Sequence, residues 1–187
     1  MDTRPMNAAE PPPLVLRRCA RVLVADEDDR VLFNFSSGAV SPESQFFDTI
    51  GGGIDADETP PEAAARELFE ETGLRVEPAD LGPVVAHTAG EWWAGPTTRI
   101  YQDDTYFFLR TPHFTPTFDY MEEGERRSIT SAEWLTVSQL DTIDHAVFPV
   151  PIATLVKQLI GGDLPTEPVE LTWVNWTGVD KRCPVPE

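Results

Sequence analysis

Residues 52–74 read GGIDADETPPEAAARELFEETGL, and this stretch contains the clearest structural signals of the 187-residue chain. Thr59 followed by Pro60 predicts a helix start, because threonine caps free N–H groups and proline is tolerated in the first turn. Gly73 stands where a left-handed residue commonly ends a helix. We therefore expect a helix from Pro60 to Thr72. Its spacing assigns one face to the core: Ala64, Ala65, Leu68, Phe69 and Thr72.

Three carboxylates share a neighbouring face of this expected helix. Glu67, Glu70 and Glu71 are three and four residues apart, so they repel one another by roughly 0.2–0.5 kcal/mol per pair. The helix dipole adds to this cost near the C-terminus. Arg66 can pair with Glu70 but cannot neutralise all three groups. A hard cation such as Mg²⁺ can neutralise all three carboxylates. The charge pattern of the helix by itself is equally well explained by an acidic face exposed to solvent.

Strands are expected on both sides of the helix. Leu14–Ala25 and Arg30–Phe35 are apolar and flank the turn residues 26–29, which predicts a β-hairpin. Further strands are predicted at Phe46–Ile50, Pro83–Ala89, Tyr101–Arg110 and Ser131–Val137, and a second helix at Val150–Ile160. Trp92 and Trp93 are expected in a loop. This mixed order predicts an α/β fold, a sandwich and not a helical bundle or an all-β barrel.

The length fits one domain with two tails. We expect a flexible N-terminal arm over residues 1–13, which ends in three prolines, and a domain over residues 14–162. The Pro-rich tail, residues 163–187, contains Trp173 and Trp176, so we expect it to pack on the domain or on a partner subunit. Cys19 and Cys183 are too few for a disulfide framework and are interpreted as structural thiols.

The charge balance limits the partners. Fourteen Lys and Arg residues against 32 Asp and Glu residues give a net charge of -18, which opposes binding of long nucleic acid. A small anionic ligand that arrives with divalent cations is compatible with this acidity. No apolar run is long enough to span a membrane and the N-terminus lacks a signal-peptide pattern, so we expect no membrane association and a cytoplasmic location.

The stretch 52–74 resembles the signature of the Nudix hydrolase family: Gly, five residues, Glu, seven residues, then Arg-Glu-aliphatic-x-Glu-Glu-x-Gly-aliphatic. Every fixed position is matched, by Gly52, Glu58, Arg66, Glu67, Leu68, Glu70, Glu71, Gly73 and Leu74. One departure lies outside the signature, at Ile50, where many relatives carry proline. The resemblance implies an α/β/α sandwich with a mixed sheet, and a hydrolase that cleaves a diphosphate linkage in a small nucleotide-type substrate.

The resemblance also implies a role for each matched residue. Glu67, Glu70 and Glu71 would bind Mg²⁺, or Mn²⁺, together with the carbonyl of Gly51. Arg66 would orient the carboxylates, and Gly52 and Glu58 would support them. The ions would neutralise phosphate charge and activate a water for attack on phosphorus. Glu67 is the candidate base on the helix, and Glu125 is the candidate from a later loop, because its distance from Trp134 resembles that of a loop glutamate in similar sequences.

Several residues outside the signature are weaker candidates. Trp93 and Tyr101 are candidates for stacking on a substrate ring, as are Phe46, Phe47 and Trp92, and Arg99 is a candidate phosphate ligand. Core, interface or surface positions explain the same residues. A homodimer is expected, since relatives are often dimeric.

Two alternative functions remain open at this stage. One is a diphosphate isomerase of the same fold, which needs a suitably placed cysteine. The other is a nucleotide-sensing module without catalysis, although such modules usually lose signature glutamates and this chain retains them all.

Overall fold

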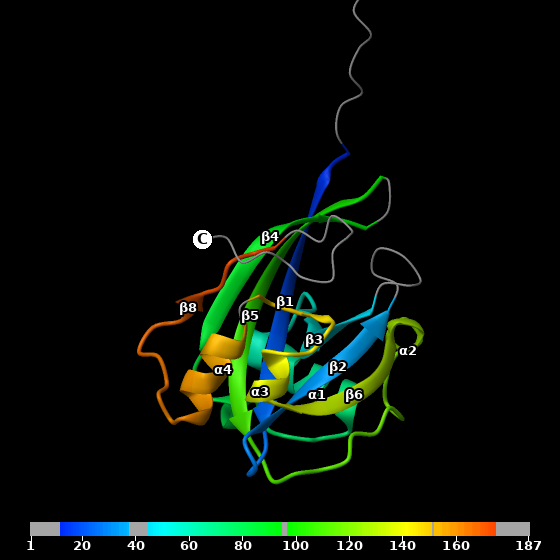
Figure 1. The fold of residues 1–187 in the computed structure, drawn as a ribbon. Helices are drawn as coiled ribbons and strands as arrows, with labels where there is room; N and C mark the ends of the chain where they lie inside the picture. Colours follow the sequence, from blue (N-terminus) through cyan, green and yellow to red (C-terminus); the bar gives the residue numbers. More distant parts are fainter. Residues whose placement is uncertain (1–11, 38–44, 95–96, 151, 175–187) are drawn as a thin grey trace, which may run out of the picture.

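A computed structural model describes residues 12–37, 45–94, 97–150 and 152–174. Its centre is one mixed eight-stranded sheet, in the order β6-β2-β3-β1-β5-β4-β8, with β7 paired to β3 (Figure 1). The pairs β1–β5, β3–β7 and β4–β8 are parallel, and the other pairs are antiparallel. The strands are β1 Leu14–Ala25, β2 Arg30–Ser37, β3 Gln45–Gly53, β4 Ala86–Trp93, β5 Arg99–Arg110, β6 Ile129–Thr136, β7 Ala146–Val147 and β8 Val169–Glu170.

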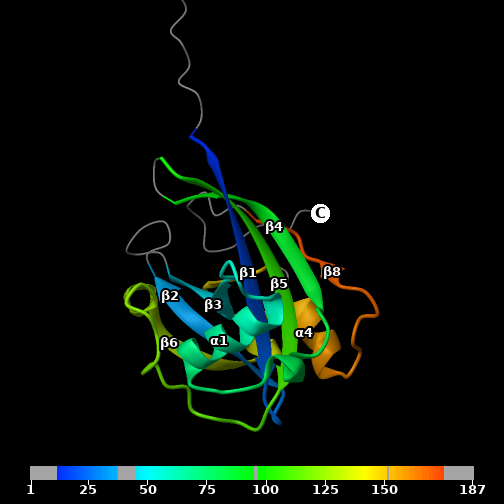
Figure 2. The same ribbon diagram turned by 180° about the vertical axis from the view of Figure 1, so that it is seen from behind.

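Helices cover both faces of this sheet. The helix α1 (Pro60–Thr72) lies on one face, and α3 (Val137–Leu140) and α4 (Ile152–Ile160) lie on the other (Figures 1 and 2). A short helix, η1 (Pro78–Leu81), follows α1, and another, α2 (Glu125–Ser128), comes directly before β6. The expected α/β/α sandwich with a mixed sheet is therefore confirmed.

The two faces of the sheet have separate apolar cores, which follow from alternation along β1. Val22 and Val24 pack with Leu68 of α1, whereas Leu23 packs with Leu155 of α4. All five side chains are buried. The sheet thus separates a layer that contains the acidic helix from a layer that does not.

The expected helix at Pro60–Thr72 has the predicted bounds, but several strands begin or end elsewhere. The strand predicted at Pro83–Ala89 begins at Ala86 and continues to Trp93, so Trp92 and Trp93 lie in a strand and not in a loop. β5 begins at Arg99, two residues early. These extensions occur because β4 pairs along its whole length with the first part of β5, from Ala86 opposite Tyr106 to Trp93 opposite Arg99. Such pairing partners are not visible to local patterns.

Phe69 departs from the expected core face of α1. It is only partly buried. Its ring packs against the ring of Tyr120, with the two centroids 4.3 Å apart, and the Arg75 guanidinium carbon lies over it, 3.9 Å from the Phe69 centroid. Ala63 is buried instead. The loop that follows β5 supplies this second contact surface for the helix, which a helical wheel cannot predict.

Parts of both expected tails lie outside the described residues. These parts are residues 1–11 of the N-terminal arm and residues 175–187 of the C-terminal tail, which include Trp176 and Cys183. In the described part of the tail, β8 pairs with β4, and Trp173 Nε1 donates to the carbonyl of Glu91 at 3.2 Å. No helix within the described ranges has the length and apolar character needed to cross a membrane.

Candidate active site and metal centre

The helix α1, which carries three of the candidate carboxylates, has well-defined ends. Pro60 begins the helix, and the Thr59 N–H donates to Glu62 at 2.8 Å. Gly73 ends it with a φ of 77°, and its N–H donates to the Phe69 carbonyl at 2.8 Å. A left-handed residue at this position favours glycine. These ends set the limits of the helix, and the apolar residues Ala64 and Leu68 pack its face against the sheet.

Glu71 lies between α1 and the sheet, where two N–H donors from different strands bind one of its oxygens. The Gly51 N–H of β3 donates to Oε2 at 2.8 Å, and Asn34 Nδ2 of β2 donates to the same oxygen at 2.9 Å. Two donors occupy the lone pairs of Oε2. Oε1 is therefore the oxygen that stays available for a cation.

Glu67 lies beside the glycine bend and is 4% exposed. Arg66 Nη1 donates to its Oε1 at 2.9 Å, while its buried Oε2 has no hydrogen-bond partner in the part of the chain that the structure describes. A Cβ added to Gly52 would come within 2.5 Å of Glu67 Oε1. Gly52 therefore leaves the space in which this carboxylate sits.

Arg66 connects the remaining carboxylates. Its Nε and Nη2 bind both oxygens of Glu58, at 2.7 and 2.8 Å, and its Nη1 binds Glu70 at 2.9 Å. Bidentate pairing of this kind fixes the plane of the guanidinium. The Glu58 contacts raise the pKa of Arg66, and in return the pKa of Glu58 is lowered. Glu70 is thus paired with Arg66.

A fifth glutamate reaches the site from a segment far from α1 in the sequence. Glu125 is the first residue of α2. One carboxylate oxygen of Glu125, one of Glu67 and one of Glu71 all lie within 4.8 Å of one another. Its Oε2 also accepts the Glu122 N–H at 3.0 Å. The structure therefore brings the loop candidate and two of the three helix candidates together.

Burial shifts the titration of this cluster. It raises the pKa of Glu67 to about 7, against the opposing effect of Arg66, and nearby Glu125 and Glu70 add to the increase. Burial also raises the pKa of Glu71, with a further contribution from the charge of Asp48. The pKa of Glu70 is raised by burial as well. Carboxyl groups with raised pKa values gain most from a cation that compensates their charge.

A divalent cation fits this donor set. Three carboxylate oxygens converge from two segments, and the buried Glu67 Oε2 lacks a partner among the described residues. Oxygen donors of this number are what Mg²⁺ and Mn²⁺ bind, with water and phosphate oxygens completing the coordination. Glu67, Glu71 and Glu125 are the residues that would hold the ion.

Other expected site residues lie differently. The Gly51 N–H donates to Glu71, and the Gly51 carbonyl, which is the expected backbone ligand of the cation, lies 3.5 Å from Arg21 Nη1. Trp93 and Arg99 pair at the far end of β4 and β5, where Arg99 also binds Glu91 at 2.6 Å. Along β1, Arg99 pairs at Leu14, whereas Gly53 of the glycine bend pairs at Cys19. These two positions on β1 are five residues apart, which corresponds to roughly 16 Å along the strand. Tyr101, opposite Leu16, lies on the same extension.

Asn34 is a residue of the site that the sequence analysis did not identify. Its only available signal was weak, a polar side chain in an otherwise apolar stretch of β2. Which strand faces Glu71 depends on the strand order, and local patterns do not determine that order.

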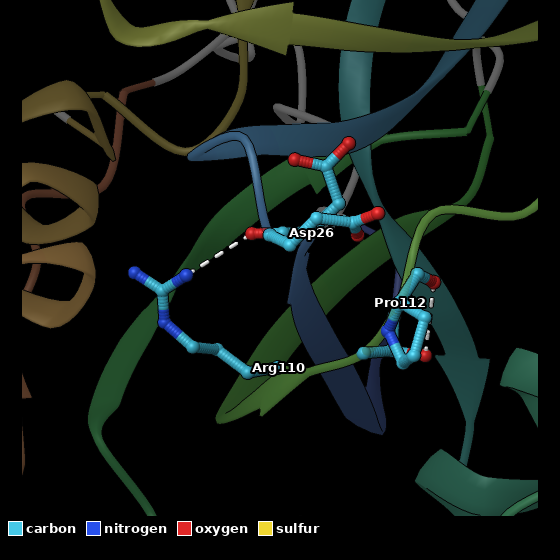
Figure 3. Close-up of a pocket in the computed structure, with 5 residues that line it drawn as sticks. Asp26, Arg110 and Pro112 are labelled. Carbon is cyan, nitrogen blue, oxygen red and sulfur yellow. Dashed lines mark hydrogen bonds between the residues drawn. The ribbon is translucent and has the colours of Figure 1, made fainter.

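A surface hollow of about 690 Å³ lies away from these carboxylates, where β5 ends beside the β1–β2 turn (Figure 3). Arg110 lines this hollow, and its guanidinium donates to the Asp26 carbonyl at 3.0 Å, the Asp29 carboxylate at 2.7 Å and the Ile160 carbonyl at 2.7 Å. The Asp26 carboxylate is likewise bound by Arg30. The polar groups here connect the turn to β5 and α4, and they stabilise the fold.

Solved structures of other proteins share this fold. A solved structure of a MutT protein from Methanosarcina mazei Go1 is 16% identical, with a TM-score of 0.55, and covers 83% of this chain and 99% of its own. The E. coli dihydroneopterin triphosphate pyrophosphohydrolase is 19% identical, with a TM-score of 0.54, over 79% and 99% of the two chains. At these identities the likeness concerns the fold.

Among curated proteins, no sequence matches this chain. The NUDIX domain family matches residues 15–155, which include the core on the α1 face, most of the core on the α4 face, the acidic helix and Glu125. The chain therefore belongs to the Nudix family.

Proposed function

We propose that this protein is a Mg²⁺-dependent hydrolase, with Mn²⁺ as a possible substitute, that cleaves a diphosphate linkage in a small nucleotide-type substrate. The observation that supports this most directly is the convergence of Glu67, Glu71 and Glu125 within 4.8 Å, with a buried carboxylate oxygen of Glu67 left without a described partner. When ionised, the three carboxylates repel one another, and a bound cation would compensate this repulsion.

The chain's own residues divide the proposed reaction between them. Glu67, Glu71 and Glu125 bind the cation, which supplies charge neutralisation at phosphorus and a more acidic water. Glu67 and Glu125 are the candidates for the general base that takes the proton of the attacking water, because Oε2 of Glu67 is buried and accepts no hydrogen bond from the described residues, and Glu125 approaches it from α2. Arg66 holds Glu67 and Glu70 in place, and Glu58 holds Arg66. Gly52 leaves room for Glu67, and Gly51 fixes Glu71.

A small phosphorylated substrate suits the charge of the chain. A net charge of -18 disfavours long nucleic acid, whereas a nucleotide that arrives with its cations is not excluded. The E. coli structure is named a dihydroneopterin triphosphate pyrophosphohydrolase, and the likeness of fold supports a small phosphorylated substrate by analogy only. Trp93, Tyr101 and Arg99 remain candidates for the part of a long substrate remote from the diphosphate.

The test is a panel of nucleoside triphosphates, dinucleoside polyphosphates and nucleotide sugars, incubated with Mg²⁺ or Mn²⁺ and followed by ³¹P NMR in ¹⁸O water. Turnover should require the cation, and the position of ¹⁸O identifies the phosphorus that is attacked. Glu71→Gln should lower kcat at least about 100-fold while leaving the circular dichroism spectrum unchanged, because it removes a carboxylate and keeps the shape. An inactive parent protein across the whole panel contradicts the proposal.

The two alternatives are less well supported. A diphosphate isomerase needs a reactive cysteine, but Cys19 is fully buried and burial raises the pKa of its thiol to about 11. Its side chain alternates with Ala20, which packs in the α1 layer, so it faces away from the acidic helix. A sensing module would bind a nucleotide tightly without turnover, which the same panel detects.

We also propose a cytoplasmic homodimer. Leu14, Val15 and Leu16 are 45–64% exposed on the end of β1, and consecutive exposed apolar residues on a strand favour burial against a partner. Sedimentation at low and high protein concentration distinguishes a dimer from a monomer.

A further inference from the structure

Asn34 occupies a position in β2 where an amide is unfavourable for folding alone. It is 1% exposed and lies two residues from Leu32, which packs in the α1 core from the same face of the strand. Asparagine is depleted in strands, and burial of an amide costs free energy unless it is hydrogen-bonded. A reason other than β2 stability is needed for this residue.

The side chain makes one hydrogen bond within the described residues, from Nδ2 to Glu71 Oε2 at 2.9 Å, and its Oδ1 is buried without a partner among them. Only the NH₂ end of the amide can face a carboxylate oxygen. The contact therefore fixes both the orientation of Asn34 and the plane of the Glu71 carboxylate.

A neutral donor has a particular consequence at a cation site. Arg66 pairs with Glu67 and Glu70 and partly compensates their negative charge. Asn34 and the Gly51 N–H hold Glu71 without adding a positive charge. The full charge of this carboxylate thus stays available to a cation, and both donors bind Oε2, so that Oε1 is left for coordination.

From this geometry we propose that Asn34 is a positioning residue for the metal centre, which acts by holding Glu71 in the orientation that binds the cation. The proposal rests on the proposed function, since it requires Glu71 to be a metal ligand. Groups that orient a metal ligand typically contribute 10- to 100-fold to metal affinity.

The test measures binding of Mn²⁺ alone, by electron paramagnetic resonance, to the full-length protein and to two variants. Asn34→Leu removes the donor and keeps the number of side-chain heavy atoms. Asn34→Thr places a smaller, β-branched side chain in the strand, and its hydroxyl is too short to reach Glu71. Both should raise the Kd for Mn²⁺ about 10- to 100-fold. Using two variants keeps the test valid if one of them does not fold.

Thr88→Val is the matched control. Thr88 is also 1% exposed in a strand, and its hydroxyl makes one buried hydrogen bond, to the Leu171 carbonyl at 3.0 Å. The variant loses a comparable bond far from the carboxylates, so its Kd for Mn²⁺ should stay within about twofold of the parent value.

A double-mutant comparison separates positioning from general stability. In a Glu71→Gln background, Asn34→Thr should weaken Mn²⁺ binding no further, because the carboxylate that it positions is gone. Folded Asn34 variants with the parent Kd, or an additive loss in the Glu71→Gln background, would overturn the proposal while leaving the proposed hydrolase intact. A parent protein that binds no Mn²⁺ would instead refute both.

Discussion

Gly52 shows how a single residue without a side chain shapes the site. Its position leaves a Cβ only 2.5 Å from Glu67 Oε1, and the atoms in the way are the movable end of a side chain. Gly52→Ala should therefore fold, with the midpoint of thermal unfolding lowered by only a few degrees, but with the Glu67 carboxylate displaced. We expect kcat to fall at least about tenfold, since a small misplacement at a reacting group has a large effect.

Gly53→Ala is the matched control for this prediction. A Cβ at Gly53 meets nothing within 4 Å, although the residue is adjacent in the chain. Its kcat should remain within about twofold of the parent value. Equal losses in the two variants would show that flexibility of the glycine stretch, and not the space beside Glu67, determines the activity.

The site residues differ in how well the sequence could predict them. Glu58, Arg66, Glu67, Glu70 and Glu71 follow from the spacing of one motif. In the structure Arg66 pairs with Glu58, Glu67 and Glu70, and a Glu71 oxygen lies within 4.8 Å of a Glu67 oxygen. Their assignment as ligands or base stays a prediction. Asn34 could not be predicted, because its contact joins residues 37 positions apart through the register of β2 and β3.

At the scale of one element, α1 combines precise ends with an unfavourable charge pattern. The local signals at Thr59, Pro60 and Gly73 predict its bounds because caps act within a few residues. The environment of its acidic face is not local. Glu67 and Glu71 are buried by strands from elsewhere in the chain, whereas the wheel assigned only apolar residues and Thr72 to the core.

This burial predicts how the stability of the cation-free protein depends on pH. The pKa of Glu67 is raised to about 7 and that of Asp48 to about 6, and those of Glu70 and Glu71 are also raised. The folded state therefore holds protons that the unfolded chain has released. The free energy of unfolding in EDTA should fall between pH 5 and pH 8, on the order of 2 kcal/mol, most steeply up to about pH 7.

Urea unfolding at several pH values measures this effect. Groups with lowered pKa values, such as Asp26 and Glu58, lose their contribution only at lower pH and do not mask it. Addition of Mg²⁺ should stabilise the protein more at pH 8 than at pH 5, because the cation requires ionised carboxylates. Glu67→Gln should flatten the dependence. A free energy of unfolding that rises with pH in EDTA would contradict the burial of these groups.

At the scale of the whole molecule, the sheet lies between the candidate site on the α1 face and the apolar core on the α4 face, which contributes much of the stability. The order of elements predicts a mixed α/β sandwich, but the strand order β6-β2-β3-β1-β5-β4-β8 depends on contacts between distant segments. β1 illustrates this: it forms only a short hairpin with β2, at Val24 and Ala25, and pairs along its whole length with β5. Local alternation identifies a strand but not its neighbours.

The separation of the two layers predicts that one large-to-small substitution destabilises the protein without changing the metal site. Leu155 of α4 is 2% exposed in the core opposite α1. Leu155→Ala should lower the free energy of unfolding by about 2–5 kcal/mol, through lost burial and the cavity left behind. Below its unfolding transition the variant should bind Mn²⁺ within about twofold of the parent Kd, because β1 and its neighbours lie between α4 and the carboxylates.

Leu68→Ala is the counterpart on the other face. Leu68 is fully buried between β1 and α1, and it stands next to Glu67 in the helix. Its truncation should cost a similar free energy of unfolding, but the helix can then shift on the sheet and the Kd for Mn²⁺ should rise severalfold. Urea unfolding in EDTA and Mn²⁺ titration of both variants decide the matter. If Leu155→Ala weakens Mn²⁺ binding as much as Leu68→Ala, the sheet transmits packing changes from one layer to the other and does not isolate the site from them.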